Sequence, residues 1–178
     1  MCLVDLTIDM DVFELKQEVI NKFGGVDILI NCAGAIYAGD VESLFPQDYD
    51  YLMDLNLRSP FLLTLFFKKY LKHSQGCIVN ISCTRGNRPE PGMLGYCMTK
   101  AGLEMFTQTT AMELAPSGVR VNAVAPCTVN DTNLYLYAMC DDASDAAMKK
   151  RAAANTPLMQ NCEVEDVAKA VIFLTSEK

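Results

Sequence analysis

Three short apolar runs, separated by much longer segments, constrain the fold of this chain more than any other feature. The runs are Val26–Ile30, Cys77–Ile81 and Val119–Ala125, and glycine or proline residues stand next to each of them. Short apolar runs bounded in this way are typical of buried strands. Strands that are joined through helices form a parallel sheet covered on both faces. The sequence therefore predicts an α/β fold in a single domain, residues 1–178.

The segments around these runs have the apolar periodicity and the end signals of helices. Asp9 is expected to cap the first helix and Gly24-Gly25 to stop it, while Cys2–Val4 is expected to be the end of a further buried strand. The expected helices run from about Met10 to Phe23, from Pro46 to Leu71 with an interruption at Pro60, from Tyr96 to about Ala115, and over Val164–Thr175.

Charge and hydropathy exclude several classes of function. The net charge is −7 and no run of Lys and Arg is present, which argues against nucleic-acid binding. The most apolar run, Pro60 to Phe67, is too short to cross a bilayer. The acidic N-terminal segment, which has no basic residue before Lys16, is unlike a secretory signal or a mitochondrial presequence. We therefore expect a cytoplasmic protein that binds neither nucleic acid nor a membrane.

The eight cysteines are scattered, without any Cys-x-x-Cys pair, and His73 is the single histidine. Several of them lie within the apolar runs, where a free thiol behaves as a small apolar side chain. This distribution favours reduced thiols in an intracellular protein, and it predicts no metal site.

Tyr96 and Lys100 form the first candidate site because an i, i+4 pair lies on one face of a helix. A nearby ammonium favours the phenolate and lowers the pKa of a phenol, which makes it a usable proton donor and acceptor. In a parallel sheet the working crevice lies beyond the carboxyl ends of the strands. The loops Asn31–Gly34, Ser82–Thr84 and Pro126–Thr128 are expected at that edge.

Asn56 is a further candidate because of the proline that follows it. Pro60 has no N–H and its ring clashes with the carbonyl four residues earlier, which is that of Asn56. A helix through this region must kink and leave that carbonyl free to bind a water. The alternative is an asparagine in a kinked helix without a role.

Taken together these segments resemble the short-chain dehydrogenase/reductase family, over nearly the whole chain. The matching pieces are Val4–Thr7, Asp27–Gly34, Asn56-Leu57, Ile78–Cys83, Tyr96–Gly102, Val119–Pro126 and Val164–Leu174. The resemblance implies a Rossmann-like doubly wound parallel sheet. It also implies an NAD- or NADP-dependent oxidoreductase that interconverts a hydroxyl and a carbonyl group of a small molecule by hydride transfer, as a homodimer or homotetramer.

The resemblance also implies roles for individual residues. Tyr96 would be the catalytic acid/base, Lys100 would lower its pKa and hold the nicotinamide ribose, and Asn56 would hold a water of the proton relay through its main-chain carbonyl. Asp5 would meet the adenine, although an Asp at such a place is often only a residue that leads into a helix. The implied cofactor-binding set is Asp5, Leu6, Asn31, Cys32, Ala33, Gly34, Tyr96, Lys100, Pro126, Cys127 and Thr128, with Thr132 and Asn133 as further hydrogen-bonding residues.

The chain departs from the family at two single positions. Cys83 stands thirteen residues before Tyr96, where the family has a serine that binds the substrate oxygen. A thiol is a weak donor, and the neighbouring Ser82 is expected to point to the opposite face of the strand. A nucleophilic or redox role for Cys83 would need an adjacent base, and none is evident in the sequence. Cys127 replaces the family's glycine beside the nicotinamide and is expected to crowd it.

The largest departure is the absence of a glycine-rich turn after a first strand, where a dinucleotide fold receives the pyrophosphate. The chain begins near the third strand of the family pattern. We therefore expect an incomplete sheet, without the first two strands and the phosphate-binding loop, in a protein cut at both ends. The alternative function is that of a catalytically impaired homologue that acts as a structural or interaction subunit.

Overall fold

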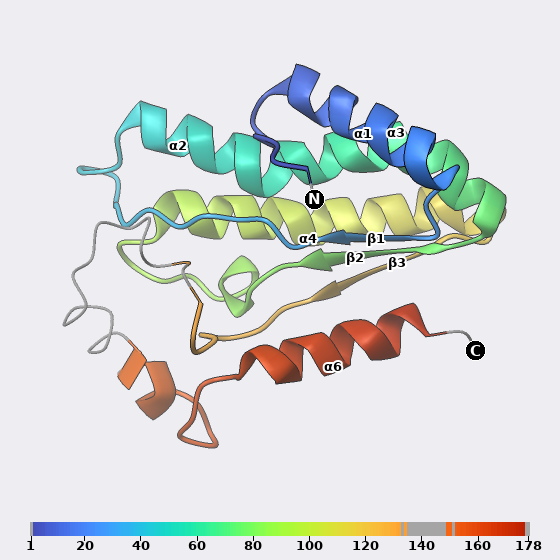
Figure 1. Cartoon of the computed structure of the whole chain (residues 1–178). Coiled ribbons are helices and arrows are strands. Elements are labelled where there is room, and N and C mark those ends of the chain that lie inside the picture. The colour runs from blue at the N-terminus through green and yellow to red at the C-terminus, as the bar shows by residue number, and fades with distance from the viewer. Residues whose placement is uncertain (1, 133, 135–148, 151, 177–178) are drawn as a thin grey trace.

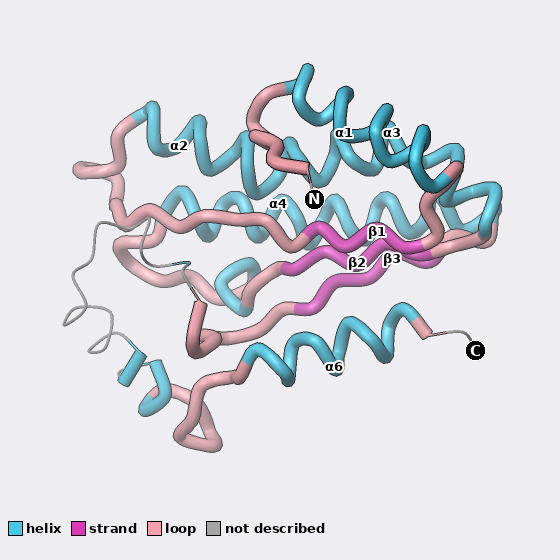
Figure 2. The backbone as a smooth tube through the Cα atoms, in the orientation of Figure 1, coloured by secondary structure: helices cyan, strands magenta, loops and turns pink. Residues whose placement is uncertain are grey.

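The computed structural model describes residues 2–132, 134, 149–150 and 152–176. Its centre is a parallel sheet of three strands in the order β1-β2-β3, formed by β1 (Ile28–Asn31), β2 (Cys77–Ile81) and β3 (Arg120–Val124). Figure 2 shows the three strands side by side, and in Figure 1 their arrowheads, which mark the carboxyl ends, point to one edge of the sheet. The three apolar runs are therefore the strands, as the sequence predicts.

Helices cover both faces of the sheet. Figure 1 shows α1, α2, α3 and α4 on one side and α6 on the other, where it contacts β2 and β3. Each expected helical segment starts and ends within three residues of its expected bounds. The segments are α1 (Asp9–Phe23), α2 (Pro46–Met53), a π-helix η1 (Asp54–Arg58), α3 (Ser59–Ser74), α4 (Leu94–Leu114) and α6 (Val164–Thr175), with the short 3₁₀ turns η2 (Thr84–Gly86) and η3 (Ala115–Ser117).

Two buried apolar clusters hold these layers together. The larger one joins α1, α3, the end of α4 and the sheet, and consists of Val12, Leu62, Leu63, Phe67, Leu71, Ile78, Leu114, Val119 and Val121. A side chain of this size contributes about 1.5–3 kcal/mol when it is fully buried. The smaller cluster, Ile36, Cys83, Met93 and Tyr96, lies at the carboxyl edge of the sheet. The core thus extends into the region where the sequence places the site.

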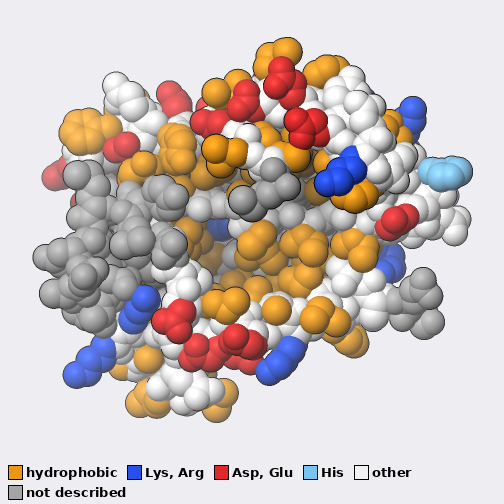
Figure 3. Space-filling model, viewed as in Figure 1, with side chains coloured by type: hydrophobic (Ala, Val, Ile, Leu, Met, Phe, Trp, Pro, Cys, Tyr) orange, Lys and Arg blue, Asp and Glu red, His pale blue; other side chains and the backbone are white. Residues whose placement is uncertain are grey.

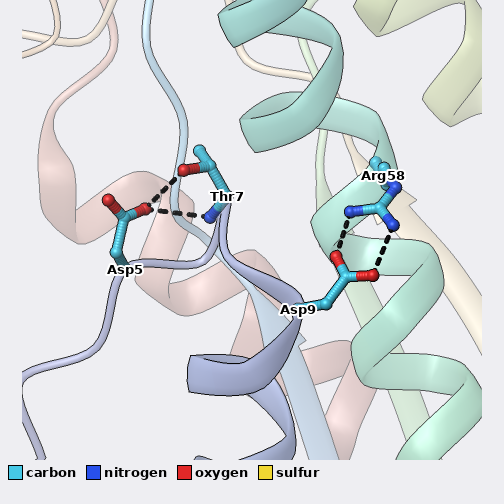
Figure 4. A network of polar contacts seen from close by, with 4 residues as sticks. All are labelled: Asp5, Thr7, Asp9 and Arg58. Carbon is cyan, nitrogen blue, oxygen red and sulfur yellow. Dashed lines mark hydrogen bonds and ion pairs between the residues drawn. The ribbon is translucent and has the colours of Figure 1, made fainter.

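The first ten residues differ from two expectations. Cys2–Val4 is not a strand, and Leu3 is fully exposed, because no neighbouring strand of the described sheet offers this segment a hydrogen-bonding partner. Asp9 is not the cap of α1 but its first residue, and Ile8 takes the N-cap position without a side-chain hydrogen bond. The Asp9 carboxylate instead pairs with the guanidinium of Arg58, as Figure 4 shows.

The interruption predicted at Pro60 is a π-helical turn that precedes the proline. In a π-helix each N–H bonds to the carbonyl five residues back, and the N–H of Ser59 donates to the carbonyl of Asp54 in this way. The next N–H would belong to Pro60, which has none. The carbonyl that would have received it, that of Leu55, accepts the Ser59 hydroxyl at 2.8 Å. The helix therefore continues past the proline with a register shift.

β1 forms one edge of the described sheet, and its outward side chains are apolar. Ile28 and Ile30 are each 45% exposed. In Figure 3, apolar side chains gather in a band across the middle of this face, between the α1 layer and α6. Among the described residues, no helix combines the length and the hydropathy that a bilayer crossing requires.

Candidate active site

The loops that follow the three strands meet at a cavity of about 560 Å³ at the carboxyl edge of the sheet. This is the edge at which the sequence predicts a working crevice, and each predicted loop contributes at least two residues to the wall. α4 and α6 close the cavity from the two faces of the sheet. The wall includes Cys32, Gly34, Ile81, Ser82, Cys83, Arg85, Tyr96, Lys100, Pro126, Cys127, Thr128, Thr132, Val164, Val167 and Ala168.

Tyr96 and Lys100 lie together in this wall, on the first turns of α4. Their side chains are almost completely buried, with 3% and 5% exposure. The Lys100 Nζ lies 5.5 Å from the centroid of the Tyr96 ring, and it donates a hydrogen bond of 2.9 Å to the carbonyl of Ile81 at the end of β2. The helical spacing seen in the sequence thus becomes a buried cation beside a buried phenol.

Burial sets the protonation of Lys100. Desolvation disfavours the ammonium and lowers the pKa of Lys100 from 10.5 to about 8, while Cys83, Cys32 and Glu104 act in the opposite direction. At pH 7 the side chain is therefore still mostly a cation. A cation in a region of low dielectric favours the anionic form of a neighbouring acid more strongly than it would in water.

The side chain of Asn56 connects the loop after β1 to α4. Its Oδ1 accepts the N–H of Ala35 at 2.9 Å, and its Nδ2 donates to the carbonyl of Ala35 at 2.9 Å and to Thr99 Oγ1 at 3.2 Å. Thr99 Oγ1 in turn donates to the carbonyl of Tyr96 at 2.8 Å. Sequence reasoning considered only the main chain of Asn56 and missed this role of its side chain.

Gly34 is placed where a side chain would collide with this arrangement. A Cβ at Gly34 would lie 3.1 Å from Asn56 Oδ1 and 3.8 Å from Lys100 Nζ. The first of these separations is tighter than nearly all real Cβ contacts. The glycine therefore lets the loop pass close to Asn56 and Lys100.

Cys83 and Ser82 both line the cavity. Cys83 is 4% exposed, and the Arg85 Nη1 lies 3.9 Å from its sulfur. Ser82 is 3% exposed, and its Oγ has no hydrogen-bonding partner among the described residues. Sequence reasoning set Ser82 aside because successive strand residues point to opposite faces. Ser82 follows the last residue of β2, however, so the alternation of the strand does not extend to it.

The predicted cofactor-binding residues divide between two places. Cys32, Gly34, Pro126, Cys127 and Thr128 line the main cavity together with Tyr96, Lys100 and Thr132, whereas Asn133 lies outside the described residues. Leu6, Asn31, Cys32 and Ala33 line a second cavity of about 340 Å³ between α1, β1 and α3.

Asn31 and Asp5 are occupied by other contacts. The Asn31 Nδ2 donates to Asn80 Oδ1 at 2.7 Å inside the sheet. Asp5 is exposed and lines neither cavity. Its carboxylate accepts hydrogen bonds from the hydroxyl and the N–H of Thr7 at 2.7 and 2.9 Å, which lower the pKa of Asp5 (Figure 4). Among the described residues, no group of His, Cys, Asp or Glu is arranged to hold a metal ion.

Comparisons with known proteins agree with this architecture. A family described as Enoyl-(Acyl carrier protein) reductase matches residues 1–178. The 3-oxoacyl-[acyl-carrier-protein] reductase FabG of Staphylococcus epidermidis is 36% identical over 171 residues, and the match covers 94% of this chain and 66% of that protein. The corresponding reductase of Thermotoga maritima is 32% identical over 166 residues, with 93% of this chain and 65% of that protein covered.

Solved structures of similar proteins show the same fold. A short-chain dehydrogenase/reductase of unknown function from Caenorhabditis elegans, determined with cofactor, has a TM-score of 0.87 and 28% identity over 97% of this chain and 66% of that one. The 3-ketoacyl-(acyl-carrier-protein) reductase of Brucella melitensis, complexed with NADH, has a TM-score of 0.85 and 27% identity, with 97% of this chain and 69% of that one covered.

The present chain thus spans slightly less than two thirds of the length of the curated relatives that it matches. The sequence match over all 178 residues, the parallel sheet and the likeness to solved structures confirm the predicted family and its Rossmann-like fold. The chain belongs to the short-chain dehydrogenase/reductase family.

Proposed function

We propose that this protein is an NAD(P)-dependent oxidoreductase that interconverts a hydroxyl and a carbonyl group. The observation that carries the proposal is the buried pair of Tyr96 and Lys100 in the wall of the cavity, with the Lys100 Nζ 5.5 Å from the phenol ring. A buried cation next to a proton-exchanging phenol has a clear use in acid/base chemistry and little use in a purely structural helix.

The residues present fit a nicotinamide cofactor. The cavity of about 560 Å³ lies within the range of small-molecule sites, Gly34 leaves room for a close approach, and the buried Ser82 Oγ lacks a partner among the described residues. When it is bound, such a cofactor supplies or accepts the hydride. Cys32, Gly34, Pro126, Cys127 and Thr128 would hold it in the cavity, with Lys100 at its ribose. Outside this cavity lie Asp5, Leu6, Asn31 and Ala33, which would contact the adenine end of the cofactor.

Tyr96 would give its phenolic proton to the oxygen of a carbonyl substrate, or take the proton of an alcohol in the reverse direction. Lys100 would stabilise the phenolate that forms. Among the described residues the single hydrogen-bond acceptor of Lys100 is the Ile81 carbonyl, so two of its three N–H groups remain for the ribose and the proton relay. The main-chain carbonyl of Asn56 would hold a water that returns the proton to Tyr96.

Cys83 would face the substrate oxygen, where it replaces a hydroxyl donor. A thiol donates weakly, and the loss of one good oxyanion donor typically lowers the rate by about 10² to 10³. This single position also supports the second candidate function, that of a catalytically impaired subunit. Both candidate functions keep the cavity, so turnover is the property that distinguishes them.

The proposed substrate is a small or medium-sized carbonyl or alcohol compound, and 3-oxoacyl thioesters are the first to test because two relatives are 3-oxoacyl-[acyl-carrier-protein] reductases. We further propose a homodimer or homotetramer that pairs through α3 and α4. These helices expose Phe61, Leu65, Met105 and Met112, apolar side chains that a partner would cover. The free thiols of the described cysteines fit the reducing conditions of the cytoplasm.

Calorimetric titration with NADH and with NADPH tests the binding half of the proposal. Nicotinamide absorbance with a 3-oxoacyl thioester then tests turnover. We expect binding in the wild type, and in Tyr96→Phe we expect retained binding with turnover lowered by about 10² to 10⁴. Binding without any turnover in both proteins would favour the impaired subunit. No heat at millimolar concentrations of either cofactor would refute both halves of the proposal.

A further inference from the structure

The thiols of Cys127 and Cys162 touch each other beside the main cavity, although they are 35 residues apart. The distance between their sulfur atoms is 3.3 Å. Cys127 lies in the loop after β3 and Cys162 just before α6. Among the residues that the structure describes, no other two cysteine sulfurs are in hydrogen-bonding contact. We propose that Cys127 and Cys162 are a redox-active pair that forms a reversible disulfide.

Backbone hydrogen bonds hold the two cysteines in register. The N–H of Cys162 donates to the carbonyl of Thr128 at 3.0 Å, and the N–H of Asn130 donates to the carbonyl of Cys162 at 2.9 Å. These bonds form an isolated parallel bridge between Val129 and Cys162. The contact between the sulfurs is thus a consequence of the paired backbone.

The geometry requires little movement for a bond to form. The sulfurs have to approach from 3.3 Å to about 2.05 Å, which is a shift of about 1.2 Å. Both residues are partly exposed, and Cys127 lines the cavity, so a small oxidant reaches its sulfur from solvent.

The reaction needs an oxidant, and a low-molecular-weight disulfide such as oxidised glutathione is sufficient. The Cys127 thiolate attacks one sulfur of that disulfide and releases one glutathione thiolate. Cys162 then loses its proton and attacks the Cys127 sulfur of the mixed disulfide, which releases the second glutathione. The protein loses two hydrogen atoms, and the small disulfide is reduced to two thiols.

The order of attack follows from access to the cavity. Cys127 lines the cavity and Cys162 does not, so Cys127 meets the oxidant first and Cys162 acts as the resolving residue. Burial, and next the hydrogen bond to Cys127, raise the pKa of the Cys162 thiol, which suits this later role. The disulfide would join the loop after β3 to the segment that leads into α6, and that loop and α6 both line the cavity.

Mass spectrometry of the whole chain after incubation with oxidised glutathione tests the pair. We expect the mass to fall by about 2 Da, for two hydrogen atoms, and a non-reducing digest to contain the Cys127–Cys162 cross-linked peptide. Dithiothreitol should restore both the mass and the labelling of the two thiols by iodoacetamide. These readouts do not involve turnover, so they hold whether or not the chain is an active reductase.

The variant Cys162→Ser keeps a hydrogen-bonding side chain and should accumulate one glutathione on Cys127 instead of the cross-link. Cys2→Ser, at an exposed thiol on the α1 side, is the matched control and should form the cross-link as the wild type does. Oxidation should also raise the thermal unfolding midpoint of the wild type but not that of Cys162→Ser. A stable glutathione adduct on Cys127 or Cys162 of the wild type, a cross-link from either residue to another cysteine, or the absence of the Cys127–Cys162 peptide would each overturn the proposal.

Discussion

Replacement of Asn56 by alanine tests whether its side chain holds the site together. Asn56 is 1% exposed and makes three hydrogen bonds, two of them to the backbone of Ala35, which is itself 1% exposed. Asn56→Ala removes the partners of a buried N–H and a buried carbonyl at once. A buried polar group that loses its partner costs about 1–3 kcal/mol. We therefore expect the free energy of unfolding to fall by about 2–5 kcal/mol.

Urea denaturation followed by circular dichroism measures this loss, with the free energy extrapolated linearly to water. Asn87→Ala is the matched control, because Asn87 is exposed, and we expect a change within about 0.5 kcal/mol. The double variant with Thr99→Ala isolates the bond between Asn56 and Thr99. A loss below about 1 kcal/mol for Asn56→Ala would refute the reasoning, since it would mean that the Ala35 backbone finds other partners.

Three further variants test the remaining parts of the site. Lys100→Met should be more stable than the wild type at pH 7. Between pH 8 and 10.5 the unfolded wild type still binds a proton that the folded wild type has lost, so the stability of the wild type rises with pH. The advantage of Lys100→Met should therefore shrink over this range. Equal pH profiles of the two proteins in urea denaturation would contradict this expectation. Ser82→Ala should raise the free energy of unfolding by about 1 kcal/mol, because it removes a buried hydroxyl without a partner among the described residues. It should also weaken NADH binding in calorimetry. A lower free energy of unfolding would show that the hydroxyl has a hydrogen-bonding partner. Cys83→Ser should raise turnover of a 3-oxoacyl thioester with unchanged cofactor affinity, and an unchanged rate would mean that this position does not face the substrate oxygen.

Local patterns were sufficient to predict β1, β2, β3 and the long helices, although they also predicted a strand at Cys2–Val4 that does not form. The three apolar runs became β1, β2 and β3, and Gly24 ends α1 with a left-handed φ of 78°, as its place after the helix predicts. Lys100 could also be assigned to the site, because the spacing from Tyr96 fixes both on one helix face. Such features depend on neighbours within a few residues, which the sequence displays directly.

Contacts between distant segments were beyond the reach of these patterns. Asn56 binds Ala35 across 21 positions, and Cys127 meets Cys162 across 35. Neither pair has a spacing that would single it out. The same limitation explains the wrong prediction for Asp9. Its position before a helix predicts an N-cap, but its carboxylate pairs with Arg58, which is 49 positions away.

At Pro60 a local feature of the sequence, the missing N–H, leads to a contact between distant segments, that of Asn56 with Ala35. The missing N–H of the proline converts the preceding turn into a π-helix, and this inserts one residue into the register of the helix. Leu52 before the π-turn and Ser59 after it are both at most 2% exposed, and Asn56 between them is buried as well, so the turn directs a polar amide into the interior. A buried amide has to find partners, and the Ala35 backbone supplies them. Those bonds hold the loop in which Gly34 passes close to Lys100, and thus one wall around the buried cation depends in part on a proline of another helix.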